Sequence, residues 1–300
     1  MAQPKHPFQA RIEYACAVLL ISLLRGLPLP AANVLARTAG RLLDIAVPRL
    51  RRTAMLNLSF AFPELAYEHR QAIVDGVFQS IARLLVAIAR FPTLNKSNVH
   101  RWIRYEGLEN YLEAKREGKG ILIATAHLGN WELSAFAHAL MTEPMNVMVR
   151  PLDNPLIDRL VETRRQLSGN HLILKKDAAR RVLRALRDNE AVGILIDQNA
   201  STSEGVFVNF FGKQACANAG FVKLAHHSGA AVIPGFAIWD SNTAQYILHF
   251  YPKIDIQGDV EADSQRLHSV LESVIRKYPD QWLWIHRRWK TRPPGEPSLY

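Results

Sequence analysis

Short apolar runs and helix-length segments alternate along the chain from about residue 120 onward. The apolar runs are interpreted as buried strands, at residues 121–126, 145–149, 171–174, 191–196, 230–233 and 246–250. Helices are predicted over residues 131–140 and 155–167, from an N-cap at Asp177, and over 217–228 and 261–278. Apolar strands that alternate with helices indicate an α/β sheet covered on both faces.

The N-terminal region departs from this pattern. Residues 14–24 form an apolar run flanked by Arg11 and Arg25, and the run is shorter than the roughly 20 residues that span a bilayer. Glu13 and the lack of a small-x-small cleavage site argue against a signal peptide. Two interpretations remain: a buried core helix, or a helix that lies in or dips into one leaflet of a membrane. The flanking basic residues favour the membrane helix. We therefore expect residues 1–30 to form a membrane-associating helix.

Two further helices are predicted over residues 31–47 and 68–91. The second is so apolar that it is either well buried or partly in lipid. Between them, residues 49–52 form a short basic cluster, which is either a solvated face or a contact for lipid headgroups. Because the chain has no internal repeat and no Gly/Ser-rich linker, we expect residues 31–300 to form a single domain.

The charge of the chain favours anionic partners. Its 37 Lys and Arg residues against 27 Asp and Glu give a formal charge of +10, which suits nucleic acid, an anionic membrane surface, an acidic protein or a phosphorylated substrate. Neither a helix-turn-helix pattern nor an aromatic RNA-binding signature is found, so a nucleic acid partner is not expected. Cys16 and Cys216 do not suffice for a disulfide framework or a metal site. We expect no metal and no cofactor.

Three of the predicted strands are directly followed by a polar residue that can do chemistry. These residues are His127, Arg150 and Asp197. Ligands of open α/β sheets bind at the carboxyl ends of the strands. We therefore expect the functional site at this edge of the sheet.

His127 is the most informative of the three. Glu132 lies in the first turn of the helix that follows, where its carboxylate can approach the imidazole across the turn at Gly129 and Asn130. Such a carboxylate fixes the tautomer, and the other ring nitrogen then acts as a general base. With no Ser or Cys beside it, this base would activate a hydroxyl of the substrate. The alternative is that Glu132 only complements the helix dipole.

The spacing of His127 and Glu132 also carries a resemblance. The sequence H-x-x-x-x-D/E directly after a strand resembles the signature of the lysophospholipid and glycerolipid acyltransferases, and more narrowly the chain resembles the bacterial lipid A late (secondary) acyltransferases. The match continues through Asn57–Glu64, Arg150–Pro155, Asp197–Gln198, Val208–Gly212, Ile233–Pro234 and Tyr278–Pro293. The resemblance implies a mixed, mostly parallel sheet flanked by helices, a membrane-associating N-terminal arm over residues 1–30 and one acyltransferase domain over residues 31–300.

The resemblance also implies a reaction. A fatty acyl chain would move from an acyl carrier protein thioester, with a coenzyme A thioester as the alternative donor, to a hydroxyl of a lipid A precursor at the cytoplasmic face of the bacterial inner membrane. His127 would act as the general base and Glu132 would hold it, so these two are the expected catalytic residues. The amides of Gly129 and Asn130 are candidates for stabilising the oxyanion.

Five residues are expected to bind substrate. Arg150 is expected to bind a phosphate of donor or acceptor, since a guanidinium forks onto phosphate oxygens, and Arg164 could serve likewise. Asp197 is expected to orient Arg150 or the acceptor. Gln198 and Asn130 complete the set.

Each of these assignments has a structural alternative. Arg150 would otherwise form a salt bridge with Asp153 or Asp158, Arg164 would be a surface charge, and Asp197 would cap a turn. For Trp282, Trp284 and Trp289, a place in the core and a place at the headgroup level are both open.

Other functions remain open on the sequence alone. An acyltransferase of the same mechanism could act on a lysophospholipid, an aminolipid or another glycolipid. A noncatalytic membrane-associated protein is the less favoured alternative, because it would not need His127 and Glu132.

Overall fold

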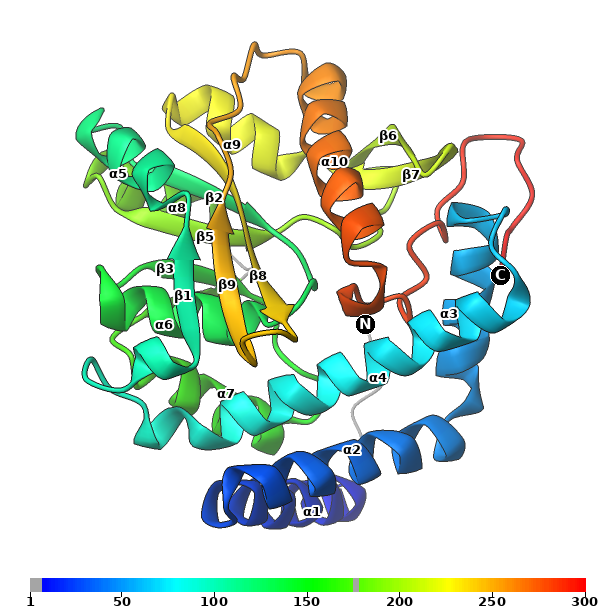
Figure 1. The fold of residues 1–300 in the computed structure, drawn as a ribbon. Coiled ribbons are helices and arrows are strands. Elements are labelled where there is room, and N and C mark those ends of the chain that lie inside the picture. Colours follow the sequence, from blue (N-terminus) through cyan, green and yellow to red (C-terminus); the bar gives the residue numbers. More distant parts are fainter. Residues whose placement is uncertain (1–6, 175–177) are drawn as a thin grey trace.

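A computed structural model describes residues 7–174 and 178–300 of the chain; the predicted cap at Asp177 lies outside these residues. The core is a seven-stranded sheet in the order β1-β9-β8-β2-β5-β3-β4 (Figure 1). The strands are β1 (Ile103–Glu106), β2 (Ile121–Thr125), β3 (Asn146–Val149), β4 (His171–Leu174), β5 (Ala191–Leu195), β8 (Ala231–Asp240) and β9 (Gln245–Phe250). Within this sheet of the described residues, only β8 and β9 pair in antiparallel fashion. The predicted mixed, mostly parallel sheet is therefore confirmed.

Helices cover both faces of this sheet. They are α4 (Tyr67–Arg90), α5 (Leu108–Arg116), α6 (Trp131–Met141), α7 (Pro155–Gln166), α8 (Ala178–Arg187), α9 (Gly220–Ser228) and α10 (Val260–Lys277). Strand β2 shows why two layers are needed, because all of its first four side chains are apolar and buried. Ile121 and Ile123 pack in the cluster of α4 and α6, whereas Leu122 and Ala124 pack in the cluster of α8 and α9.

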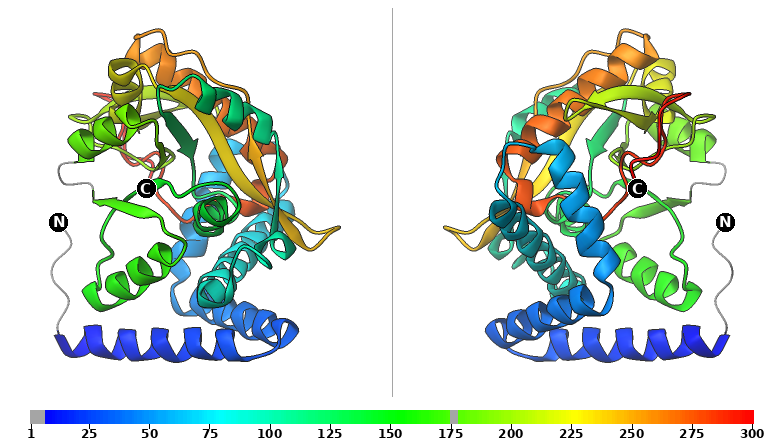
Figure 2. Two further views of the ribbon diagram at one scale, coloured as in Figure 1. Left: turned by 90° about the vertical axis from the view of Figure 1, so that its left-hand side faces the viewer. Right: turned by 90° about the vertical axis from the view of Figure 1, so that its right-hand side faces the viewer.

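The N-terminal helices form an additional layer outside α4. The layer consists of α1 (Pro7–Gly26) and α2 (Leu29–Ala46), which lie side by side along one end of the molecule (Figures 1 and 2). Helix α3 (Pro48–Ala61) follows them and packs in the core cluster that contains Trp284 and Trp289. Small residues of α2 and α4, such as Ala36 and Ala82, let these helices approach closely. In α1 only Ala10, Ile21 and Leu24 are buried, so α1 is not a buried core helix.

Two helical segments of the described chain are long and apolar enough to cross a membrane, by length and composition alone. These are α1 and the segment Tyr67–Thr93, which contains α4. More than half of the second is buried inside the protein, whereas little of α1 is. The apolar character of α4 therefore serves the core, and α1 remains the segment suited to lipid.

Several elements were not predicted. The segment between Gln198 and the helix predicted at 217–228 contains a hairpin of β6 (Gly205–Phe210) and β7 (Lys213–Asn218), so α9 begins at Gly220 rather than at residue 217. Strand β1, helix α5 and helix α3 were also missed. The basic cluster at residues 49–52 lies within α3, where Arg51 forms a salt bridge with Asp44. Short 3-10 helices occupy Phe91–Thr93, Val99–Arg101 and Pro279–Gln281.

The C-terminal segment is part of the core. Trp282, Trp284 and Trp289 are at most 1% exposed, and their indole nitrogens donate hydrogen bonds inside the protein. This satisfies the one polar atom of each ring and lets the remaining apolar surface be buried. Of the two interpretations of these tryptophans, the core is right and the headgroup level is wrong.

Candidate active site

Two adjacent parallel strands bring His127 and Asp197 together. Strand β2 pairs with β5 so that Thr125 lies opposite Leu195, and each functional residue follows two positions beyond that pair. The Nδ1 atom of His127 lies 2.9 Å from Oδ1 of Asp197. The expected gathering of polar groups at the carboxyl edge of the sheet is therefore seen for this pair.

The Asp197 carboxylate is buried and accepts three hydrogen bonds. Besides the imidazole, its Oδ2 accepts hydrogen bonds from the backbone N–H of His127 at 3.0 Å and from Nε1 of Trp282 at 2.9 Å. Burial alone would raise the pKa of Asp197, but the charge and hydrogen bonds of His127, together with Trp282, hold it at about 2. The carboxylate is thus ionised, and it holds Nδ1–H of the imidazole.

The other nitrogen of His127 faces the outside of the sheet edge. Its Nε2 lies 3.5 Å from the exposed Gln198 amide nitrogen, and the imidazole is 16% exposed. The ring of Trp131 packs edge-on against it with 4.9 Å between centroids. Burial lowers the pKa of His127, but the Asp197 charge and hydrogen bond outweigh burial and the net shift is upward. This imidazole is oriented, partly accessible and basic.

Glu132 does not hold His127 by a hydrogen bond, and the predicted pairing is corrected here. Its two oxygens accept hydrogen bonds from Nε and Nη2 of Arg165 in α7, at 2.8 and 2.6 Å. From the first turn of α6 the side chain projects toward α7, and a bidentate guanidinium is a stronger partner than a neutral imidazole. Glu132 still acts on His127 through space, since its charge is among the causes that raise the pKa of the imidazole.

The amides of Gly129 and Asn130 are not available for an oxyanion. The N–H of Gly129 donates to the Gln281 carbonyl and that of Asn130 donates to the Ala237 carbonyl, each at 2.9 Å. Gly129 has φ +63°, and a Cβ there would lie 1.9 Å from the Ala237 oxygen, so only glycine fits this turn. The expectation that these two amides bind the oxyanion is therefore wrong.

Asn130 is a helix cap rather than a substrate contact. Its side chain is fully buried, and its Oδ1 accepts a hydrogen bond of 2.9 Å from the Leu133 N–H. The first-turn amides that find no acceptor within α6 are then those of Trp131 and Glu132. Because Trp131 packs on His127, this end of the helix lies beside the imidazole.

Arg150 lies at the same sheet edge and is exposed. It follows β3, whose neighbour in the sheet is β5. Within the described chain no ion pair holds Arg150, so the alternative salt bridge with Asp153 or Asp158 is not formed. Asp158 instead accepts a hydrogen bond from the Leu152 N–H. Among the described residues, the Arg150 guanidinium therefore has no carboxylate partner.

Arg164 faces the N-terminal layer. Partial burial and the charge of Arg25 lower its pKa, while Tyr14 acts in the opposite direction. Arg25 and Tyr14 both belong to α1, and no carboxylate pairs with Arg164 among the described residues. At the start of the same helix, Asn154 caps α7 and donates to the Ala10 carbonyl, which joins α7 to α1. The positive charges of Arg25 and Arg164 therefore lie near one another, between α1 and α7.

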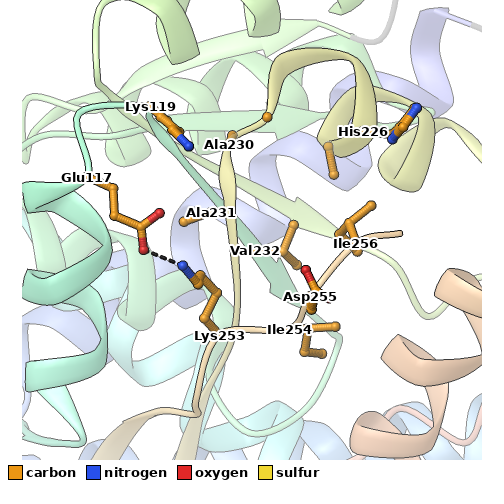
Figure 3. A pocket seen from close by; sticks show the side chains of 12 residues that line it. Glu117, Lys119, His226, Ala230, Ala231, Val232, Lys253, Ile254, Asp255 and Ile256 are labelled. Carbon is orange, nitrogen blue, oxygen red and sulfur yellow. Dashed lines mark hydrogen bonds and ion pairs between the residues drawn. The ribbon is translucent and has the colours of Figure 1, made fainter. Parts of the chain in front are cut away.

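One hollow of the surface lies away from His127. A hollow of about 210 Å³ opens between the start of β8 and residues 253–256 (Figure 3), and Lys119, His226 and an ion pair of Glu117 with Lys253 line it. It lies at the amino end of β2, opposite His127. Within residues 7–174 and 178–300, no group of three or more His, Cys, Asp and Glu is placed to hold a metal ion.

Two residues of the site were not anticipated. Trp282 binds the Asp197 carboxylate from 85 positions away in the chain, and Arg165 binds Glu132 from 33 positions away. Neither has a local sequence signal, because both contacts depend on how distant segments pack.

Comparison with known proteins identifies the family of the chain. The family described as bacterial lipid A biosynthesis acyltransferase matches residues 5–291. The chain belongs to this family. It is 28% identical to a lipid A biosynthesis acyltransferase of Haemophilus influenzae, with 94% of this chain and 89% of that protein covered.

Two relatives from Escherichia coli carry more specific names. A lipid A biosynthesis palmitoleoyltransferase is 29% identical and a lipid A biosynthesis lauroyltransferase is 30% identical, each over 91% of this chain and 90% of the relative. The chain is therefore an acyltransferase, and its family implies a lipid A-type acceptor and an acyl donor. The predicted resemblance is confirmed over almost the whole length.

Proposed function

We propose that this acyltransferase moves a fatty acyl chain from a carrier thioester to a hydroxyl of a lipid A precursor, with His127 as the general base. The observation that carries the proposal is the His127–Asp197 contact of 2.9 Å. It fixes Nδ1–H toward a buried carboxylate and leaves Nε2 as the proton acceptor at the carboxyl edge of the sheet.

The reaction needs no covalent enzyme intermediate. As the acceptor oxygen attacks the thioester carbonyl carbon, its proton passes to Nε2 of His127. Asp197 stabilises the imidazolium that forms. The tetrahedral intermediate then expels the thiolate, which takes the proton from Nε2, so that an ester, a free thiol and neutral His127 remain. The amides of Trp131 and Glu132 at the start of α6 have no acceptor among the described residues and are the candidates for stabilising the oxyanion.

The acceptor is proposed to approach from the N-terminal layer. Arg150 is exposed and has no ion pair among the described residues, and Arg164 lies beside Arg25 without a carboxylate partner. Such arginines suit phosphate groups of a lipid headgroup. Gln198 lies next to Nε2 of His127, where it can contact the reacting hydroxyl.

The N-terminal layer is proposed to rest on the cytoplasmic face of the bacterial inner membrane. Its exposed apolar side chains include Phe8 and Leu19 of α1 and Leu42 and Ile45 of α2, with Ile45 73% exposed. Arg11, Arg37 and Arg41 are exposed on the same helices. Apolar side chains beside basic ones are typical of helices that lie in an anionic interface.

The test is an acyl-transfer assay on the purified, detergent-solubilised protein. The donor is an acyl carrier protein thioester and the acceptor a lipid A precursor that lacks secondary acyl chains, with mass spectrometry of the product. The wild type is expected to add one acyl chain, and His127→Ala to lose on the order of 10² to 10⁴ in rate. A folded His127→Ala protein with the wild-type rate would contradict the general base. Transfer to a lysophospholipid but not to the lipid A precursor would contradict the acceptor.

A further inference from the structure

Helix α8 carries four arginines on its outer surface. Arg180, Arg181, Arg184 and Arg187 are all exposed and are called the α8 arginine stripe below, while Val182, Ala185 and Leu186 bury the opposite face. The helix contains no acidic residue. In the part of the chain that the structure describes, the stripe has one carboxylate neighbour, Asp188, 3.9 Å from Arg184. An exposed pair at that distance contributes little, so the described residues leave most of the positive charge of the stripe without a carboxylate partner.

A shallow apolar groove runs between α8 and α9. It has a volume of about 440 Å³ and is lined by Ala179, Leu183, Gly220, Lys223, Leu224 and His227. Its floor is apolar and its lining includes no carboxylate. The α8 arginine stripe borders it on one side, and Lys223 and His227 border it on the other. A helix with an apolar face and acidic flanks would match this surface.

The connections of α8 and α9 place one end of the groove near the reaction. Helix α8 follows the carboxyl end of β4 and leads back to β5, while α9 leads back to β8. Because β4, β5, β8 and β2 are parallel to one another, the helices start on the edge that carries His127 and end on the opposite edge. A partner in the groove therefore lies beside the catalytic edge.

The groove is turned away from the N-terminal layer. Helices α8 and α9 pack on the face of the sheet with Leu122 and Ala124. Helices α1 and α2 pack on α4, which covers the other face. In Figures 1 and 2, α9 and α1 lie at opposite ends of the molecule. A bilayer that touches α1 and α2 cannot also touch α9, so the partner of this groove comes from the aqueous side.

We infer that the α8 arginine stripe and the α8–α9 groove dock the acidic carrier protein that delivers the acyl thioester, through an acidic amphipathic helix. The inference rests on the proposed function, which needs a thioester donor at the catalytic edge. Opposite charges steer the encounter and set the register, and the apolar floor buries side chains of the docked helix.

The test compares two charge reversals of equal size. Arg180→Glu/Arg184→Glu alters the stripe. Arg101→Glu/Arg104→Glu makes the same change in net charge in β1, the far edge strand of the sheet, and in the 3-10 helix just before it. Direct binding of a purified acyl carrier protein without an acyl chain is measured for both variants and the wild type. KM is then measured with the acyl carrier protein thioester and with the coenzyme A thioester of the same chain.

Arg180→Glu/Arg184→Glu is expected to weaken carrier binding and raise the carrier KM by about tenfold or more, from at least two altered charge contacts. Its kcat and its KM for the coenzyme A thioester stay unchanged, and Arg101→Glu/Arg104→Glu behaves like the wild type. No carrier binding by the wild type, equal losses in both variants, or loss of anionic vesicle binding with unchanged carrier binding would each overturn the docking site. Wild-type protein that binds the carrier but transfers no acyl chain would instead contradict the proposed function. In that case, a loss of carrier binding in Arg180→Glu/Arg184→Glu alone would still support the docking site.

Discussion

At the scale of single residues, the Asp197 carboxylate controls the orientation and the charge of His127. It accepts hydrogen bonds from both Nδ1–H and the backbone N–H of this histidine. It also accepts one from the indole nitrogen of Trp282. The pKa of His127 is raised in spite of burial. An imidazole with a raised pKa is a stronger base, but it is protonated and inactive at a higher pH than an ordinary histidine.

This balance predicts a pH profile for the wild type and for Asp197→Asn. In the wild type, kcat/KM is expected to fall as the pH drops below an inflection above the ordinary histidine value of about 6.5, since the base is then protonated. Asp197→Asn removes the charge that raises the pKa, so the inflection moves to lower pH. The rate at high pH falls on the order of 10³-fold, because the tautomer and orientation are lost.

Steady-state kinetics from pH 5 to 9 check both effects, with circular dichroism as the folding control. If the inflection of Asp197→Asn stayed at the wild-type pH, the carboxylate would not govern the base.

The sequence predicts where along the sheet the site residues lie, but it does not predict which of them form hydrogen bonds with one another. His127, Arg150 and Asp197 were recognised as strand-end residues, and the structure has them at one edge of the sheet. The partner of His127 was assigned to Glu132, five positions away, because local spacing makes that contact possible. The actual partner is 70 positions away, and the contact depends on β2 and β5 being neighbours, which periodicity does not reveal.

At the scale of elements, α7 connects the active-site helix to the N-terminal layer. Arg165 of α7 binds Glu132 of α6, while Asn154 at the start of α7 donates to the Ala10 carbonyl and to Oε2 of Glu13 in α1. Helix α7 thus contacts α6 near its end and α1 at its start, and these two polar contacts position α1 relative to α6.

The first contact predicts a coupling between Glu132 and Arg165. The side chains are only 9% and 18% exposed, so Glu132→Gln is expected to lower the free energy of unfolding by about 3 kcal/mol, because it leaves a charge buried without its partner. Glu132→Gln/Arg165→Met is expected to lose less than the sum of the two single variants. Denaturant unfolding in detergent measures the cycle. Additive losses would contradict a direct pair.

The second contact predicts that Asn154→Ala costs more than the loss of a helix cap. Asp259→Ala is a matched control, because Asp259 caps α10 with hydrogen bonds to the amides of Glu261 and Ala262 and has no bond to α1 among those described. Each cap contributes about 1 kcal/mol, and Asn154 also makes two bonds to α1. We expect Asn154→Ala to lower Tm more than Asp259→Ala, in thermal unfolding followed by circular dichroism. Equal shifts would contradict a role in holding α1.

At the scale of the whole molecule, the proposed lipid contact and the proposed carrier contact lie on different faces. The N-terminal layer exposes a set of apolar side chains that a soluble surface rarely gathers in one place. The α8 arginine stripe lies beyond the sheet from that layer. Under these proposals, a membrane-bound acceptor and a soluble donor would reach the edge that carries His127 without competing for one surface.

This arrangement predicts that Leu42→Ser weakens binding to anionic vesicles. Burying a leucine side chain contributes about 1.5–3 kcal/mol, so the partition coefficient is expected to fall by roughly tenfold or more. Leu112→Ser is the matched control, because Leu112 is also exposed but belongs to α5. Flotation with phosphatidylglycerol-containing vesicles measures the effect. Equal binding by the two variants would contradict the assigned lipid-facing side.

The sequence by itself determined the class of fold, the edge that carries the polar residues and the resemblance to the family, because these depend on local periodicity and on residues close in the chain. Only the tertiary structure decided which carboxylate serves His127, which amides remain free and which apolar residues stay exposed. A long apolar helix is mostly buried in the case of α4 and mostly exposed in the case of α1. Hydrophobicity favours the burial of an apolar side chain wherever an apolar surface is available. The packing of distant segments decides whether the chain itself provides that surface.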